Sequence, residues 1–206
     1  MGDTGAMLAR RVGEDGLLVE CADADDVAAT YATLRGIAGS LGADEIVPGA
    51  RTVLLDGVAD RNAVERLLQD LVAHAPVRRT SREVEIPVTY DGPDLAEVAR
   101  QWGVDPDDVV RIHTGTTFLV AFCGFAPGFG YCTGLPHGLT VRRRAEPRPS
   151  VPAGSVALAG EFTGGYPRSS PGGWQLVGRS EVELWRPDHA QPALLAPGTR
   201  VRFVDG

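Results

Sequence analysis

Short apolar runs and apolar stripes at helical spacing alternate through the first third of the chain. Residues 7–13 and 16–20 read as two strands, and the Asp-Gly step at Asp15-Gly16 is a strong signal for a hairpin between them. Residues 44–48 and 51–56 predict a second hairpin. After each hairpin the apolar residues recur every three or four positions, which indicates an amphipathic helix.

The two predicted helices complete a small domain. The first begins after Asp23 or Asp25, either of which is a suitable N-cap, and ends near Gly39. The second covers residues 60–74. Their apolar faces comprise Val27, Tyr31, Leu34 and Ala38 in the first, and Val64, Leu67, Leu68, Leu71 and Val72 in the second. The order ββαββα predicts an α+β domain over residues 1–80, with a four-stranded sheet and both helices on one face. The basic, polar run at 75–82 is the predicted linker.

Residues 81–206 have the pattern of an all-β domain interrupted by two short helices. A strand is predicted at 83–90, and two helices follow it, with Pro93 and Pro106 in their first turns and Gly103 and Gly115 after their last turns. Five further short strands are expected, at 116–123, 155–160, 174–178, 181–186 and 199–204. Short strands separated by Gly/Pro turns favour a closed or nearly closed β barrel.

Turn residues are densest between Gly115 and Trp174, where the chain has 12 Gly and 7 Pro. The apolar runs at 118–123 and 155–159 are short enough to be buried strands, so this stretch is a folded domain and not a linker. Glycine permits positive φ and close approach of a ligand, and proline fixes φ beside it. We therefore expect function to concentrate in these loops.

Charge is unevenly distributed along the chain. The net charge of −7 argues against a general nucleic-acid binder, but residues 115–174 hold five Arg against two Glu, or +3, which leaves −10 for the rest. All 20 basic residues are Arg. The absence of lysine excludes a P-loop lysine, a Schiff-base lysine and a biotin attachment site. A phosphate or carboxylate must therefore be held by Arg, backbone N–H groups, helix N-termini or a metal.

Several other chemistries lack their sequence patterns. The three cysteines, Cys21, Cys123 and Cys132, are an odd and widely spaced set, which favours structural reduced thiols. The four His show no paired spacing typical of a metal site, and no Ser lies in a G-x-S-x-G motif. There is no signal-peptide pattern and no run of 18 apolar residues, so we expect a cytoplasmic protein without membrane association.

A series of short motifs carries a family resemblance. The chain has G-F-A-P-G-F-x-Y at 124–131, P-R at 147–148, V-P-A-G-S-V at 151–156, A-G at 159–160, T-G-x-Y-P at 163–167 and S-P-G-G-W at 170–174. In this order they closely resemble the B subunits of bacterial 5-oxoprolinases, a family with a carboxyltransferase-type subdomain that is also called allophanate hydrolase subunit 1 and includes a sporulation-kinase inhibitor. The match extends from the region of Val53 to P-G-x-x-V-R-F at 197–203.

The resemblance implies both a fold and a function. The family has a cyclophilin-like barrel preceded by a small α+β domain. The resemblance implies that this chain is one subunit of a heteromeric, ATP-dependent 5-oxoprolinase, which hydrolyses 5-oxo-L-proline to L-glutamate. ATP would be the co-substrate, and Mg²⁺ is expected to bind with the nucleotide. The expected partners are a second barrel-type subunit and a lactam-hydrolysing subunit, which would meet the 124–131 loop or the 161–174 segment. Without lysine or a nucleotide motif of its own, this chain is expected to supply half a site and to be inactive alone.

Two predicted site residues have a plain structural interpretation beside the functional one. His113 falls in the last turn of a predicted helix, where a charged imidazolium that complements the helix end and a catalytic or substrate-anchoring group are both open. The resembled family carries a His at this position. Glu161 is one of two acids in the 115–174 stretch and is interpreted as a surface residue or a catalytic one.

Substrate or nucleotide contacts are predicted in the turns and in the densest basic segment. This segment, called the arginine run below, comprises Arg142, Arg143, Arg144 and Arg148. Within that run, Arg143, Arg144 and Arg148 match family arginines, and Arg143 and Arg148 are preferred to Arg142, which replaces a proline. Trp174 is interpreted first as a packing residue. The full predicted binding set is Phe125, Pro127, Gly128, Tyr131, Arg143, Arg148, Gly154, Ser155, Tyr166, Ser170, Gly172, Gly173 and Trp174. The chain departs from the family at Cys132, usually Leu, and at Phe162, usually Gln, so a polar contact of that Gln is lost or replaced here.

Two alternatives stay open at this stage. The chain is also compatible with a non-catalytic binding module, such as a histidine-kinase inhibitor, that uses the same loops as a docking face. It is equally compatible with a subunit of an allophanate- or urea-degrading hydrolase. The motifs define a family of folds and do not define the substrate.

Overall fold

The structure is a computed structural model that describes residues 7–71 and 82–206. The chain divides into two compact units, Met1–Arg79 and Thr80–Gly206, and each is described by itself. The predicted linker at 75–82 lies outside the described residues except for Arg82. Within the two described ranges, no helix combines the length and the apolar character that a membrane span requires.

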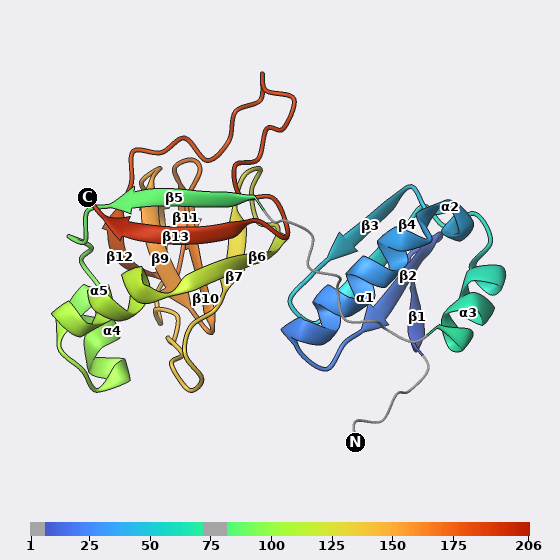
Figure 1. The fold of residues 1–206 in the computed structure, drawn as a ribbon, viewed down its shortest axis with the longest axis horizontal. Helices are drawn as coiled ribbons and strands as arrows, with labels where there is room; N and C mark the ends of the chain where they lie inside the picture. Colours follow the sequence, from blue (N-terminus) through green and yellow to red (C-terminus); the bar gives the residue numbers. More distant parts are fainter. Residues whose placement is uncertain (1–6, 72–81) are drawn as a thin grey trace. The chain divides into compact units, whose positions relative to one another are not determined.

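The first unit is a four-stranded antiparallel sheet with helices (Figure 1). Its strands, in the spatial order β1-β2-β4-β3, are β1 (Ala9–Val12), β2 (Gly16–Glu20), β3 (Glu45–Pro48) and β4 (Thr52–Asp56). Its helices are α1 (Ala24–Gly36), α2 (Ala38–Leu41) and α3 (Arg61–Asp70). One hydrophobic core joins the sheet to the helices, because Leu17 and Leu55 from the strands share it with Leu34 of α1 and Leu68 of α3.

Helix boundaries in this unit follow from local chemistry. The Asp23 side chain accepts from the Asp26 amide and caps α1, as the sequence predicts, and Asp60 caps α3 in the same way. The short helix α2 was not expected from the sequence. Gly39 lies inside it, and the helical region ends instead at Gly42, whose φ of 55° is in the left-handed region that glycine tolerates. Helix α3 ends at Asp70, and the last three residues of the predicted 60–74 helix lie outside the described residues.

The second unit is built on a seven-stranded sheet that closes almost completely into a barrel. Its spatial order is β12-β9-β10-β7-β6-β13-β5, antiparallel throughout except for the parallel pair β13 and β5. The strands of this sheet are β5 (Glu83–Val88), β6 (Thr117–Cys123), β7 (Gly130–Thr133), β9 (Ser155–Ala159), β10 (Phe162–Gly165), β12 (Gln175–Arg179) and β13 (Arg200–Asp205). A two-stranded ribbon of β8 (Arg148–Val151) and β11 (Ser170–Gly172) lies beside it.

The chain just after β5 closes the barrel against β12. Thr89 exchanges two backbone hydrogen bonds with Arg179, at 2.9 and 3.0 Å. The amides of Gly92 and Asp94 then donate to the carbonyl oxygens of Val177 and Leu176. Both edges of β12 are therefore occupied, one by β9 and the other by residues 89–94.

Two helices cover the barrel: α4 (Leu95–Trp102) and α5 (Pro106–Gly115). Pro106 lies in the first turn of α5 and Gly103 ends α4 in the left-handed conformation, as predicted. The prediction for Pro93 is wrong, because Pro93 precedes the N-cap Asp94 and stands outside the helix. Residues 89–94 belong to the closure of the barrel, and α4 begins only after that pairing ends.

The strand predicted at 181–186 is also wrong. Its alternation of Glu181 and Glu183 with Val182 and Leu184 is typical of a strand, but β12 has no free edge for it to join. Residues 184–194 instead form an extended excursion, called the arm below, which leaves the sheet between β12 and β13 (Figure 1). Its two sides are bridged at Trp185 and Ala193.

Candidate functional site

The barrel unit holds a cluster of aromatic side chains, called the aromatic wall below. Phe129, Tyr131, Tyr166 and Trp174 meet edge to face, with ring centroids 5.0 to 5.4 Å apart in the pairs that touch. Such perpendicular contacts place ring edges against ring faces, which is the favourable arrangement. Trp174 is buried, which confirms its interpretation as a packing residue, whereas Tyr131 is half-buried. The wall is therefore rigid and presents Tyr131 at its rim.

The loop at 124–128 connects this wall to a pocket. Phe125 is 58% exposed and has a φ of 64°, the one non-glycine residue in the described ranges with positive φ. A bulky side chain in this region is strained, and such strain persists where the surroundings fix the loop. Gly128 also has positive φ, and a Cβ there would lie 2.7 Å from the Cβ of Trp185. The arm thus presses on the loop at Gly128 and holds its shape.

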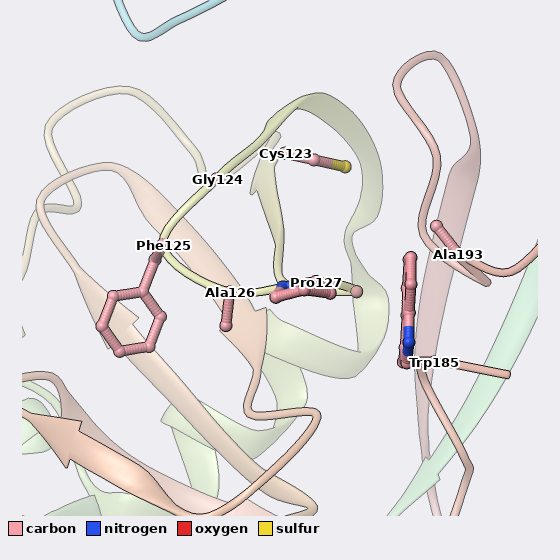
Figure 2. Close-up of a pocket in the computed structure, with 8 residues that line it drawn as sticks. Cys123, Gly124, Phe125, Ala126, Pro127, Trp185 and Ala193 are labelled. Atoms are coloured by element: carbon pink, nitrogen blue, oxygen red, sulfur yellow. The ribbon is translucent and has the colours of Figure 1, made fainter. Parts of the chain in front are cut away.

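The pocket lies between this loop and the arm and has a volume of about 410 Å³. Its lining includes Cys123, Pro127 and Gly128 on one side and Trp185 and Ala193 on the other. Figure 2 shows Trp185 facing Pro127, while the Phe125 ring points away from the arm on the other side of the loop. The pocket is open and largely apolar, so it suits a flat or apolar group of a partner or ligand.

Three hydrogen bonds to the Asp94 carboxylate organise the arginine run. Asp94 is 5% exposed, and its Oδ1 accepts from Arg144 Nη1 at 3.1 Å and from Arg148 Nη2 at 2.8 Å. Its Oδ2 accepts from the Leu176 amide at 2.7 Å. A buried carboxylate with two guanidinium partners and a backbone donor holds both arginines in place. Sequence reasoning missed Asp94, whose arginine partners lie 50 and 54 residues further along the chain.

Arg148 has donor capacity left over. Its Nη1 is buried and has no hydrogen-bond partner among the described residues. Arg143, by contrast, is exposed, and its charge acts on both tyrosines of the wall. Burial raises the pKa of Tyr131 and of Tyr166, and the positive charge of Arg143 opposes that rise at both hydroxyls. The predicted residues Tyr131, Tyr166 and Trp174 therefore come together in the wall, and the charges of Arg143 and Arg148 act on its tyrosines, a combination that suits an anion with a flat apolar part.

His113 lies elsewhere, in the core of the barrel unit. It is fully buried, with Nδ1 2.7 Å from the Tyr90 hydroxyl and Nε2 2.9 Å from the Thr163 hydroxyl. The rings of Phe118 and Phe203 flank it at 5.0 and 4.6 Å. Burial lowers the pKa of His113 to about 3, so the imidazole is neutral at pH 7. The interpretation of His113 as a charged helix cap is therefore wrong, and its catalytic role stays a prediction.

Acidification is expected to destabilise the barrel unit through His113. The folded-state pKa lies below the ordinary 6.5, so the unfolded chain binds the proton first and the free energy of unfolding falls as the pH drops below 6.5. This group alone accounts for a loss of about 2 kcal/mol between about pH 7.5 and about pH 5. Urea unfolding of the wild type and of His113→Gln at the two pH values measures it. The variant should be less stable than the wild type at the higher pH, but its free energy of unfolding should fall less on acidification. Equal decreases in the two proteins would contradict the assignment of this pH dependence to His113.

The other predicted site residues occupy turns and strands around the wall. Glu161 is exposed in the turn between β9 and β10, and Ser155 is buried at the start of β9. Gly154 has a φ of 80° and stands where a Cβ would overlap the Ser180 carbonyl, and a Cβ at Gly172 would overlap the Tyr166 hydroxyl. Because these two glycines have no side chain, the Ser180 carbonyl and the Tyr166 hydroxyl can lie close to their backbone. Ser170 donates to the Arg168 carbonyl, and the Gly173 carbonyl accepts from the Arg144 amide.

The described residues hold neither an activated thiol nor a cluster of metal ligands. All three thiols are free. Cys123 lines the pocket, but its thiol donates to the Leu195 carbonyl at 3.0 Å, and burial raises its pKa to about 11, which disfavours a nucleophilic thiolate. In the part of the chain that the structure describes, no three His, Cys, Asp or Glu side chains gather where a metal ion would bind.

Comparison with known proteins identifies relatives over most of the chain. A 5-oxoprolinase B subunit from Escherichia coli O157:H7 is 44% identical over 167 residues, which cover 78% of this chain and 77% of the relative. A 5-oxoprolinase B subunit from Bacillus subtilis strain 168 is 46% identical over 144 residues, covering 68% of this chain and 59% of the relative.

Solved structures share the fold. TTHA0988 superposes with a TM-score of 0.75 at 36% identity, covering 94% of this chain, which spans only 40% of that longer protein. The Kluyveromyces lactis urea carboxylase superposes equally well, with a TM-score of 0.75 over all of this chain and 22% of its own, but at 20% identity it shows a common fold alone. The family model for the carboxyltransferase domain, subdomain C and D, matches residues 7–195. The chain therefore belongs to the carboxyltransferase subdomain C and D family, together with the 5-oxoprolinase B subunits.

Proposed function

We propose that this chain is one subunit of a heteromeric 5-oxoprolinase, which uses ATP to open the lactam of 5-oxo-L-proline to L-glutamate. The observation that carries the proposal is its 44% identity to a 5-oxoprolinase B subunit over 78% of the chain. Because these relatives are named as subunits, their names support the existence of partner chains. A second barrel-type subunit and a lactam-hydrolysing subunit are the partners we propose.

The residues of the aromatic wall suit the chemistry of this reaction. The substrate is a flat five-membered lactam that carries a carboxylate, and the wall offers Tyr131 beside the exposed Arg143. The buried Nη1 of Arg148 is a donor that lacks an acceptor within the described residues, and a carboxylate or phosphate oxygen would supply one. These two arginines fit an anion, whether substrate carboxylate or nucleotide phosphate.

ATP, when bound, supplies the phosphoryl group that makes the lactam carbonyl a better electrophile. In this proposal Arg143 and Arg148 orient the anion and stabilise charge that develops on its oxygens. Asp94 keeps Arg148 in position through the 2.8 Å bond to Nη2. The rest of the nucleotide site and the residues that activate water are assigned to the partner subunits, because this chain has no lysine to pair with phosphate.

The test is 5-oxoproline-dependent ATP hydrolysis, measured together with glutamate formation. The purified chain alone should show none, and the complex co-expressed with both partner subunits should show it. In the complex, Arg143→Ala should lower kcat/KM by roughly 10- to 100-fold, the effect of losing one charged hydrogen bond. Arg143→Lys should lower it nearly as much, since lysine cannot reproduce the bidentate guanidinium fork.

Arg142→Ala is the matched control, because Arg142 is also exposed and adjacent in the chain. It should leave activity close to the wild type. Robust turnover by the isolated chain would overturn the half-site proposal. Full activity of the Arg143→Ala complex would indicate that the arginine run is a solvent-exposed surface without a role in binding. Failure to form a complex with either partner at micromolar concentration would favour an autonomous binding module instead.

A further inference from the structure

A second pocket lies on a different part of the barrel unit, where the start of β5 faces the arm. It has a volume of about 390 Å³, and its polar lining comprises Arg82, Arg186, His189 and Gln191. No Asp or Glu among the residues that the structure describes lines it. Two arginine side chains thus border the pocket, and the carboxylate that pairs with Arg186, from Glu183, is not part of its lining. None of the residues of the aromatic wall belongs to it.

Both sides of this pocket are held by backbone hydrogen bonds. On the arm, the Arg186 amide donates to the Pro192 carbonyl at 2.8 Å, and the His189 amide donates to the Arg186 carbonyl at 3.1 Å. The buried Leu184 and Leu195 fix the two ends of the arm in the core. On the opposite side, the Arg200 amide of β13 donates to the Arg82 carbonyl at 2.8 Å. The pocket is therefore formed in advance of any ligand.

Arg186 is left with an unused donor at this site. Its Nε is buried and makes no hydrogen bond within the described part of the chain. Glu183 forms an ion pair with Arg186, but its Oε2 lies 3.4 Å from Nε, outside the distance of a good charged hydrogen bond. A buried N–H without an acceptor is costly and calls for an explanation such as a bound ion. The guanidinium fork matches the paired oxygens of an oxyanion.

We propose that this pocket binds a small oxyanion of the phosphate class, held by Arg82 and Arg186. Two guanidinium groups offer paired N–H donors to the oxygens of a phosphate, and His189 and Gln191 add further hydrogen-bonding groups at its edge. The site is separate from the anion that we propose for Arg143 and Arg148, and it does not depend on the 5-oxoprolinase proposal. The phosphate group is either free phosphate or the terminal phosphate of a nucleotide.

The 206-residue chain and inorganic phosphate are sufficient for the test. Isothermal titration calorimetry at constant ionic strength should show saturable binding of phosphate. Arg186→Gln and Arg82→Gln should each weaken it roughly tenfold or more, the effect of losing one charged hydrogen bond. Arg186→Lys should recover only part of the affinity, because it restores the charge without the fork. Urea unfolding of each variant establishes that it is folded.

Two controls separate this site from the rest of the molecule. Arg179→Gln removes an exposed arginine that pairs with Asp91 outside the pocket, and Arg202→Gln removes an exposed arginine that pairs with Glu85 and does not line the pocket. Both should bind phosphate as the wild type does. Absence of saturable binding, unchanged affinity in a folded Arg186→Gln, or an equal loss in Arg202→Gln would each overturn the proposal.

Competition distinguishes the source of the phosphate group. Displacement of bound phosphate by ATP, abolished in Arg186→Gln, would assign the site to a nucleotide. No displacement by ATP would assign it to free phosphate, and both results uphold an oxyanion site. Equally strong displacement by acetate would contradict the phosphate class. Because these measurements need no partner chain and no 5-oxoproline, they stand or fall independently of the proposed enzymatic activity.

Discussion

Replacing Asp94 by asparagine is expected to lower the free energy of unfolding of the barrel unit by about 3 kcal/mol. Asparagine keeps an oxygen that can accept from the Leu176 amide, but it removes the charge that Arg144 and Arg148 share. Removing one partner of a buried ion pair leaves the other charge desolvated and unpaired, which costs more than the pair itself contributes. Urea unfolding followed by tryptophan fluorescence measures the loss, since Trp174 is buried in this unit.

The matched control is Asp91→Asn, three residues away. Asp91 pairs with Arg179 at 2.9 Å, but both side chains are at least half exposed, so the loss should stay within about 1 kcal/mol. Equal effects of the two substitutions would show that Asp94 does not organise the arginine run. In the reconstituted complex, Asp94→Asn should also lower activity at a temperature where the variant remains folded, because Arg148 loses the contact that orients it.

The second large effect is expected at the closure of the barrel, from Gly92→Ala. A Cβ at Gly92 would overlap the backbone of Leu176, Val177 and Gly178 in β12. Backbone cannot move aside as a side chain tip can, so the closing segment must separate from the strand, at a cost of about 3 kcal/mol. Thermal and urea unfolding report the change, and hydrogen exchange at Thr89 and Arg179 should locate it at the closure.

Gly115→Ala provides the control for this substitution. Gly115 is the last residue of α5, its φ is not positive, and a Cβ there would meet nothing within 4 Å. Alanine in a helix is favoured over glycine, so this variant should be as stable as the wild type or more stable by up to about 1 kcal/mol. A tolerant Gly92→Ala, with the exchange rates of the closure unchanged, would show that residues 89–94 are not needed to complete the barrel.

Elements with strong local signals could be predicted from the sequence. The Asp-Gly hairpin, the Asp23 cap and the apolar strand at 117–123 each depend on a few adjacent residues, and the structure has all three. Strands β7, β8, β10 and β11 are three or four residues long and contain Gly or Pro, so their own sequence carries almost no strand signal. They exist because neighbouring strands supply hydrogen bonds, which is information that a local pattern does not contain.

The residues of the candidate site also fall into those that the sequence could predict and those that it could not. The motif residues Tyr131, Tyr166 and Trp174 and the arginines could be identified because they stand in recognisable turns and a dense basic run. Asp94 and Trp185 could not. Each is an ordinary residue locally, and becomes important only when the barrel brings it to partners about 50 residues or more away. His113 shows the opposite error, since its position in a helix suggested a charged end whereas tertiary contacts bury it completely.

The parallel pairing of β13 with β5 has a consequence for biosynthesis. Arg200 lies opposite Glu83 in this pair, so the first and last strands of the barrel unit are neighbours separated by more than a hundred residues of chain. Because β13 lies between β5 and β6 in the sheet, neither of those strands can form its hydrogen bonds to β13 until residues 200–205 have left the ribosome. Until then the open barrel exposes strand edges and apolar surface, the features that invite mispairing and chaperone binding. The strands described for the first unit lie within residues 9–56, so its sheet can form while the barrel is still being made.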